Sequence, residues 1–273
     1  MTGGSATFTD DNMWLLKLDA NGNKLFSTLY SGSGAGTDRI FSIKQTPDGG
    51  YVLAGLIAAP GGNVTAGPAR GSFDYAILKL NSTGGITWQK RYGGSGIDIA
   101  SSINFTADGG YIIGGYSASP VSGDVTIAPK GGNDMWILKL NSAGAITWQK
   151  RFGGSGDDQA QDIRQTSDGG YIIGGLTSSP VSGDVTTATN GGYDGWIIKL
   201  DASGNIVWNK VYGGLGTEMI LSIIQKADGG YMAAALSNSS QTGSVTQTNH
   251  STNRDTWVLQ LDASGNIVPL TGH

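Results

Sequence analysis

Short apolar segments alternate with turn-forming clusters along the chain. In one stretch of sixty residues, four segments rich in β-branched and aromatic side chains are each bounded by Gly, Asp, Asn or Ser. These segments are Gln161–Thr166, Tyr171–Thr177, Gly195–Asp201 and Ile206–Tyr212. This composition between turn signals is typical of β-strands, and no segment shows the 3.6-residue period with caps that a helix requires. The pattern predicts an all-β chain.

Two of the connections are short turns that contain glycine. Asp168-Gly169-Gly170 joins the first segment to the second, and Ala202–Asn205 joins the third to the fourth. Glycine adopts the positive φ that tight hairpins need. Two linked hairpins therefore predict one four-stranded antiparallel sheet in each stretch.

The same arrangement recurs at a fixed spacing. The motif Asp-Gly-Gly-Tyr begins at Asp48, Asp108, Asp168 and Asp228, sixty residues apart each time. A four-stranded sheet of this size cannot bury both of its faces alone, and radial stacking of such sheets is the solution that β-propellers use. We therefore predict a β-propeller of 60-residue blades. The alternative is a β-solenoid (parallel β-helix), whose coils are usually shorter and lack tight antiparallel hairpins.

The repeat predicts a single domain, residues 1–273, made of unequal units. An N-terminal hairpin covers residues 12–30, and the repeat units cover approximately residues 31–92, 93–152, 153–212 and 213–270. The chain opens and ends on an outer hairpin, the last one made by Trp257–Leu261 and Ile267–Leu270. We expect four complete blades and an N-terminal half-blade, an imperfect five-bladed body. A segment of a longer repeat protein would show the same pattern.

The long repeat resembles a known family. The motif is carried by Tyr92–Ser101, Asp108–Gly115, Gly123–Thr126 and Gly131–Leu140, with counterparts in the other units. It is similar to the β-propeller-like repeats of large secreted or surface proteins of Bacteroidetes-type bacteria. The resemblance implies a propeller fold and a secreted or cell-surface location, although the first residues show no signal-peptide pattern. It implies little about activity, since these repeats look like scaffolding attached to other modules.

A fainter similarity is to quinoprotein blades. It is carried by Leu200–Gly204, which precedes Trp208. This similarity suggests where each blade begins and ends within the repeat. It does not suggest quinone chemistry.

Composition narrows the range of partners. The chain has 17 Lys and Arg against 21 Asp and Glu, a net charge of −4, and no basic run. The electrostatic attraction that nucleic-acid binding depends on is therefore missing.

The absence of cysteine excludes disulfides and thiolate chemistry. No apolar run approaches the roughly 18 residues of a membrane span. We expect no nucleic-acid partner and no membrane span.

One acidic residue follows the glycine-rich turn that enters each first strand. These residues are Asp38, Asp98, Asp158 and Glu218. Because the first strand of a blade is normally innermost, we expect them to form a partial ring near one mouth of the central channel. Calcium takes about six to eight oxygen ligands, so a metal site is one hypothesis. We favour the other, in which each acid caps its own turn, because no calcium-loop spacing occurs; we therefore expect no cofactor.

The long loops between the second and third segments are expected on the same face as these turns. Asp124 and Asp184 occupy comparable positions in those loops, and Asp157 adds an acid at a turn. We predict that these three residues belong to a ligand-binding face.

Aromatic and basic side chains recur at fixed positions of the third and fourth segments. The tryptophans are Trp14, Trp136, Trp196 and Trp257 in the third, and Trp88, Trp148 and Trp208 in the fourth. Each can bury about 150–250 Å², so we place them between blades, with a sugar-stacking platform as the alternative. We expect the lysines of the third segment to be solvated or packed by their stems. They are Lys17, Lys79, Lys139 and Lys199.

Residues for catalysis are sparse. The chain has two histidines, His250 and His273, and no nucleophile-elbow, metalloprotease or phosphate-loop motif. A residue that recurs in every unit more often serves the blade, whereas catalysis needs one asymmetric cluster. We therefore expect a domain that binds carbohydrate or another surface protein in adhesion and is not an enzyme. The alternatives are a passive spacer and a glycosidase or lyase.

Overall fold

The computed structural model describes residues 11–32, 36–59, 61–246 and 253–269. Its regular elements are all β-strands, as the segment pattern predicts. They are β1 (Met13–Leu18), β2 (Lys24–Tyr30), β3 (Arg39–Gln45), β4 (Tyr51–Ile57), β5 (Asp74–Leu80), β6 (Ile86–Tyr92), β7 (Asp98–Phe105), β8 (Tyr111–Ser117), β9 (Asp134–Leu140), β10 (Ile146–Phe152), β11 (Asp158–Gln165), β12 (Tyr171–Thr177), β13 (Asp194–Leu200), β14 (Ile206–Tyr212), β15 (Glu218–Gln225), β16 (Tyr231–Ser237) and β17 (Asp255–Leu261). Within these ranges, no helix is long and apolar enough to cross a membrane.

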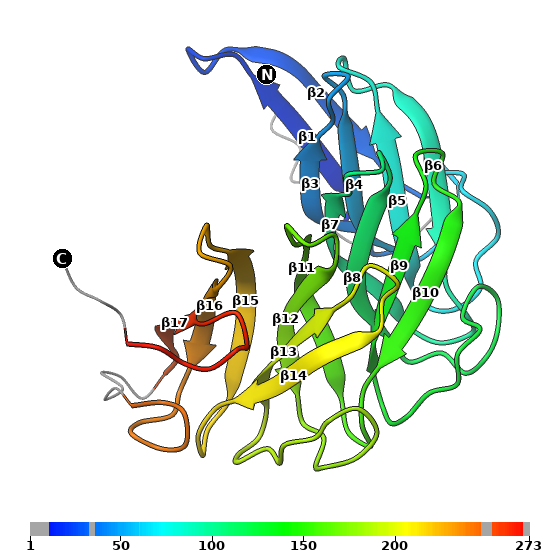
Figure 1. Ribbon diagram of the computed structural model, residues 1–273. Helices are drawn as coiled ribbons and strands as arrows, with labels where there is room; N and C mark the ends of the chain where they lie inside the picture. Colours follow the sequence, from blue (N-terminus) through cyan, green and yellow to red (C-terminus); the bar gives the residue numbers. More distant parts are fainter. Residues whose placement is uncertain (1–10, 33–35, 60, 247–252, 270–273) are drawn as a thin grey trace.

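The strands form five antiparallel sheets in chain order. Three are complete four-stranded blades, β3–β6, β7–β10 and β11–β14, whereas β15–β17 has three strands and β1–β2 has two. The sheets fan out side by side, with β3, β7, β11 and β15 innermost (Figure 1). This is the arrangement of propeller blades, and the antiparallel pairing excludes the β-solenoid. The β1–β2 hairpin lies at one end of an open arc and β15–β17 at the other.

The last blade departs from the complete fourth blade that we expected. Ile267 makes an isolated bridge to Leu261, and Val268 N–H donates to the Gln260 carbonyl oxygen (2.9 Å), but no fourth strand follows in the described part. Pro269 stands where the preceding unit has Trp208. Proline has no N–H to continue a ladder, which ends the pairing there. Leu270 lies outside the described residues.

The hairpin turns confirm the role expected of their glycines. Gly169 has a φ of 81° and lies between the two strands of the β11–β12 hairpin. The Asp168 carboxylate accepts hydrogen bonds from Gly170 N–H (3.0 Å) and the Thr166 hydroxyl (2.5 Å). The aspartate side chain therefore closes the turn that the glycine backbone permits.

The core lies between the blades and includes the tryptophans as predicted, except Trp14, which is exposed. Trp136 is fully buried and packs against Tyr75 of the preceding blade, with ring centroids 4.8 Å apart. On the opposite face of the same strand, Met135 and Ile137 pack against the following blade. Each interior sheet therefore buries both faces, and its stability depends on both neighbours.

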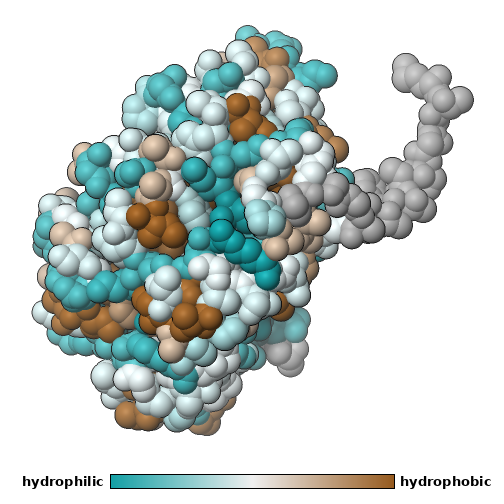
Figure 2. Space-filling model, turned by 90° about the vertical axis from the view of Figure 1, so that its right-hand side faces the viewer, coloured by the Kyte–Doolittle hydropathy of each residue, from teal (hydrophilic) through white to brown (hydrophobic). Residues whose placement is uncertain are grey.

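The outer strands are more exposed. Figure 2 views the molecule from the side on which β6 and β10 lie in Figure 1, and apolar side chains there form separate patches between polar ones. The exposed positions of β6 and β10 alternate with partly buried ones at the start of each strand.

A hydrogen-bonded belt joins the inner strands of neighbouring blades. The Ser102 hydroxyl donates to Asp162 Oδ1 (3.0 Å), and the Ser222 hydroxyl and Ile223 N–H donate to Asp162 Oδ2 (3.1 Å each). The buried Asp162 carboxylate therefore links β7, β11 and β15 around the channel.

The lysines of the third strands are not solvated. Lys139 is buried, and its ammonium group donates to Asp108 Oδ2 (2.7 Å) and to the Leu140 carbonyl oxygen (3.0 Å). Hydrogen bonds from Lys139 and Thr106 lower the pKa of Asp108 to about 2. Each interior lysine thus joins the third strand to the Asp-Gly-Gly turn of its own blade.

Because the tryptophans differ in burial, replacing them with alanine should lower the free energy of unfolding by different amounts along the arc. We expect Trp136→Ala to lower the free energy of unfolding by about 3–5 kcal/mol, because a large buried side chain is removed. Trp14 occupies the same position in β1 but is 65% exposed, so Trp14→Ala should cost less than about 1 kcal/mol. Urea denaturation followed by circular dichroism measures both. Equal losses would contradict the interblade role of Trp136.

Candidate functional site

Each acid at the start of an inner strand caps its own turn. Asp158 Oδ2 accepts hydrogen bonds from Gly154 N–H and the Ser179 hydroxyl, both at 2.8 Å. Asp98 is held in the same way by Gly94 and Ser119. The corresponding contacts are Gly214 N–H and the Ser237 hydroxyl on Glu218 (2.7 Å each), and Gly32 N–H (2.6 Å) and Ala58 N–H (3.2 Å) on Asp38. Each of the four predicted ring residues is therefore bonded within its own repeat unit, and no group of three metal-ligating side chains occurs among the described residues.

Three of these caps have a second buried acid beside them, which the sequence analysis did not identify. Asp134, from the preceding blade, lies beside Asp158 across Gly153. A Cβ atom on Gly153 would lie 2.1 Å from Asp134 Oδ1 and 2.8 Å from Asp158 Oδ2. Burial raises the pKa of Asp158, and the neighbouring carboxylate of Asp134 raises it further. The other two pairs are Asp74 with Asp98 and Asp194 with Glu218.

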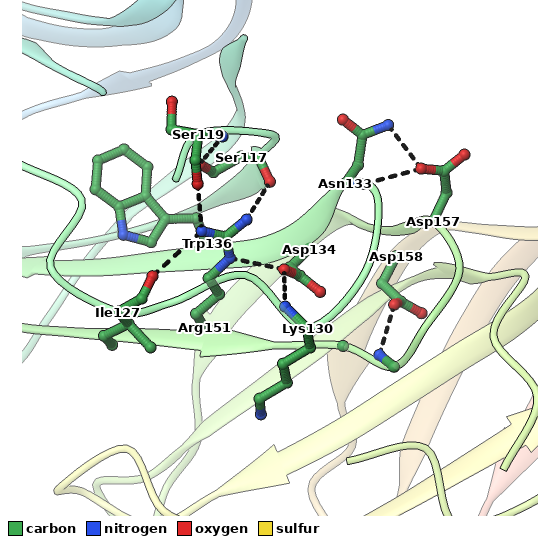
Figure 3. Close-up of polar contacts among 12 residues, drawn as sticks. Ser117, Ser119, Ile127, Lys130, Asn133, Asp134, Trp136, Arg151, Asp157 and Asp158 are labelled. Atoms are coloured by element: carbon green, nitrogen blue, oxygen red, sulfur yellow. Dashed lines mark hydrogen bonds and ion pairs between the residues drawn. The ribbon is translucent and has the colours of Figure 1, made fainter. Parts of the chain in front are cut away.

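An arginine neutralises this cluster in two of the three places. The side chains of Arg151 and Asp134 are fully buried, and Arg151 Nε donates to Asp134 Oδ2 at 2.7 Å (Figure 3). The same guanidinium donates to the carbonyl oxygens of Ser119 (2.7 Å) and Ser117 (2.9 Å). Arg151 therefore holds the long loop of its blade as well as the buried charge. Arg91 pairs with Asp74 in the preceding blade.

The third pair lacks an arginine, because Val211 occupies that position. Burial raises the pKa of Asp194 to about 6, and the adjacent Glu218 contributes to the increase. Two adjacent buried carboxyl groups cannot both ionise cheaply, so the pair keeps one proton below about pH 6.

This retained proton predicts a pH-dependent stability that one substitution removes. The folded pKa of Asp194, about 6, lies above its ordinary value of 3.8. The stabilising contribution is therefore complete below about pH 4 and is lost as the pH rises through about 6. We expect this loss to be on the order of 1–2 kcal/mol in the native protein.

In Val211→Arg, the added guanidinium should favour ionised carboxylates and remove this decrease in stability. Val211→Gln, of similar length without charge, is the control. Denaturant unfolding at intervals from pH 4 to pH 8 measures the difference between the variants. Parallel pH profiles for all three proteins would contradict the shared proton.

The predicted loop-face acids hold neighbouring loops together. Asp124 forms an ion pair with Arg70, and Asp184 forms one with Lys130. Asp157 Oδ1 accepts hydrogen bonds from Asn133 N–H (2.8 Å) and Nδ2 (3.0 Å) (Figure 3). The structure therefore gives each of these acids an interblade contact. His250 and His273 lie outside the described residues.

A groove of about 460 Å³, which we call the channel groove, lies over the inner strands β3, β7 and β11. It is close to the entry turns, because it is lined by the first and third residues of β3, the second and fourth residues of β7 and β11, and residues near the ends of β4 and β8. The lining residues are Arg39, Phe41, Leu56, Ile99, Ser101, Tyr116, Gln159 and Gln161. Its volume is in the range typical of small-molecule sites.

The polar groups of this groove are available to a ligand. The side chains of Ser101, Tyr116, Gln159 and Gln161 have no hydrogen-bond partner among the described residues. Arg39 Nε donates to Asp11 Oδ2 at 2.8 Å. Burial, and then nearby Asp157, raise the pKa of Tyr116, so its hydroxyl keeps its proton at neutral pH. The groove therefore offers amides and hydroxyls that both donate and accept.

A β-bulge positions one lining residue of each inner strand. In β11, Ala160 pairs with Gly175 and Asp162 with Gly174, so Gln161 is left out of the ladder. Ser101 is omitted from the pairing of β7 in the same way, and Phe41 from that of β3. Bulges often redirect side chains beside functional sites.

The sequence contains a signal for this groove that the repeat analysis did not use. The first and third residues after the entry acid of each inner strand differ from unit to unit, although the surrounding motif is repeated. They are Arg39 and Phe41, Ile99 and Ser101, Gln159 and Gln161, and Met219 and Leu221. Variation within a repeat marks the asymmetric surface that a specific site requires.

No family model matches the chain. The chain is similar to the regulatory protein FlaEY of Caulobacter vibrioides, with 25% identity over 197 residues. This match covers 68% of the chain and 20% of FlaEY, so the chain spans about a fifth of the length of this curated relative.

Solved structures share the repeated β-blade fold. A protein of unknown function from Bacteroides caccae has a TM-score of 0.50 and 13% identity, over 93% of this chain and 73% of that one. Hydrazine synthase of Kuenenia stuttgartiensis has a TM-score of 0.52 and 10% identity, over 91% and 56%. A variant of the Synechocystis apocarotenoid oxygenase has a TM-score of 0.44 and 12% identity, over 92% and 54%. These likenesses concern the fold.

The expectation that the chain is not an enzyme requires correction. Hydrazine synthase, an enzyme, is among the solved structures that share this blade fold. The absence of a familiar catalytic motif in a blade repeat therefore does not exclude catalysis.

Proposed function

We propose that this protein is a ligand-binding module that takes carbohydrate in the channel groove. The observation that carries the proposal is the group of unpaired polar side chains, Ser101, Tyr116, Gln159 and Gln161, beside the ring of Phe41. Sugar hydroxyls require partners that donate and accept hydrogen bonds, and amides and hydroxyls do both. Aromatic rings offer an apolar face to the C–H groups of a sugar.

The dimensions of the groove favour a small ligand over a protein surface. A protein partner of standard size buries about 800 Å² on each side, whereas a groove of about 460 Å³ suits a short oligosaccharide. The secreted or cell-surface location implied by the repeat resemblance would expose such a groove to extracellular glycans. Adhesion through carbohydrate is the corresponding cellular role that we propose.

A glycan array followed by calorimetric titration of the best ligand tests the proposal. We expect Gln161→Ala to weaken binding by about tenfold, which corresponds to the loss of about 1.4 kcal/mol from hydrogen bonds to the sugar. Gln45→Ala is the matched control, because Gln45 is exposed at the far end of β3. Mass analysis of the recovered glycan distinguishes binding from cleavage. Failure to bind any glycan, or equal affinities for all three proteins, would overturn the carbohydrate proposal.

A further inference from the structure

Among the described residues, the β1–β2 hairpin is the outer half of a blade without an inner half. In every complete blade the third strand pairs on one side with the second strand, as β9 does with β8, and on the other with the fourth. β1 corresponds to a third strand, but it pairs only with β2 among the described residues. Its other edge therefore presents free backbone donors and acceptors, which can pair with an added strand.

The apolar surface beside this edge is also uncovered. Ile43 of β3 is 42% exposed, whereas the equivalent Ile103 is fully buried in a cluster with Val52 and Ala54 of the preceding second strand. A groove of about 640 Å³ lies between β1 and β3, and a smaller one continues it toward Ile43. We call this surface the seam and define it by Met13, Trp14, Ile40 and Ile43.

Lys17, at the seam, lacks the carboxylate partner that the equivalent lysines of the interior blades have. The interior lysines Lys79, Lys139 and Lys199 form ion pairs with Asp48, Asp108 and Asp168 of the Asp-Gly-Gly turns, at 2.7–2.8 Å. Lys17 occupies the same position in β1. Its ammonium group donates to the Ser82 carbonyl oxygen (3.3 Å) and lies 5.4 Å from the centroid of the Tyr51 ring. No carboxylate pairs with it among the described residues.

We propose that the seam binds an inner β-hairpin of this repeat type that lies outside the described residues. The hairpin has an apolar first strand, an Asp-Gly-Gly turn and a second strand of the Tyr-Ile-Ile-Gly-Gly type. Its second strand extends the sheet at β1, and its turn aspartate pairs with Lys17. The interior blades support this assignment, since each shows such a hairpin at the same edge with the same ion pair.

A second copy of the chain does not supply this hairpin in its folded form. The four inner hairpins, β3–β4, β7–β8, β11–β12 and β15–β16, are each already paired with the third strand of their own sheet. The occupant is therefore an inner hairpin that has no third strand of its own.

The residues of β3 indicate which hairpin fits best. β3 presents Ile40 and Ile43, and β15 presents isoleucine at both equivalent positions. Gly174 of β12 faces this pair in β15, and a Cβ atom there would lie 2.6 Å from Ile220 Cγ2. A glycine at that position gives the space that the two isoleucines require. The β11–β12 hairpin, Asp158–Thr177, is therefore the best available probe.

A synthetic peptide of sequence Asp158–Thr177 tests the proposal on the full chain. We expect saturable one-to-one binding in a fluorescence-anisotropy titration with labelled peptide. Hydrogen exchange measured by mass spectrometry should show new protection in β1 and β3 and none in β17. This location distinguishes strand addition at the seam from non-specific association.

Matched variants separate the contributions of shape and charge. Gly174→Val in the peptide, or Ile43→Glu in the chain, should weaken binding by about tenfold or more, because the apolar contact is obstructed or made polar. Leu25→Glu is the control in the chain, since Leu25 is exposed on β2. Lys17→Asp should also weaken binding of the native peptide, and Asp168→Lys in the peptide should restore it.

Three results would overturn the proposal. One is the absence of peptide binding to a folded chain. Another is protection of the β1 amides in the free chain at low concentration, which would mean that the seam is already filled. The third is concentration-dependent dimerisation that protects β1 and excludes the peptide, which would make a second copy the occupant.

Discussion

A four-stranded sheet that is apolar on both faces is stable only between two neighbours, and this constraint organises the molecule. Trp136 and Trp14 occupy the same position of the repeat, yet one is fully buried and the other is 65% exposed. The difference arises because the blade of Trp136 has a neighbour on each side, whereas β1–β2 has one. The glycines of the second strands serve the same packing, since Gly114 and Gly174 allow isoleucines of the next blade to approach.

Close stacking also buries carboxyl groups between the blades. Two arrangements lower the free-energy cost of burying their charge. Asp134 keeps its charge because Arg151 neutralises it and, in the same position, ties down the long loop. Asp194 has Val211 in place of an arginine, and below about pH 6 it holds a proton beside Glu218 instead. A buried carboxylate without a partner is expensive, so either solution is far better than none. The same repeat therefore contains units that respond differently to pH.

Residues that recur in every unit and residues that vary between units have different roles in this fold. Residues that recur, such as the turn aspartates and third-strand lysines, hold each blade together and carry no specificity. The channel side of the inner strands varies from unit to unit, and it is there that unpaired amides and hydroxyls meet an aromatic ring. The bulge in each inner strand separates these two roles, because it leaves one residue out of the hydrogen-bonded ladder while the next residue continues the pairing.

The all-β character, the 60-residue repeat, the hairpins and the placement of every tryptophan except Trp14 between blades could be predicted from the sequence. These features follow from local backbone preferences and from periodicity, which are properties of neighbouring residues. Turn capping by Asp158 was also predictable, because its partner Gly154 is four residues away.

Only the tertiary structure decided which distant side chains meet. Asp134 reaches Asp158 from another blade, Lys139 reaches an aspartate 31 residues earlier, and Gln161 reaches the groove through a bulge. Such contacts depend on the register of the strands and on how the sheets stack. The physical reason is that burial of both faces fixes the distance between blades, and that distance selects the side chains that touch.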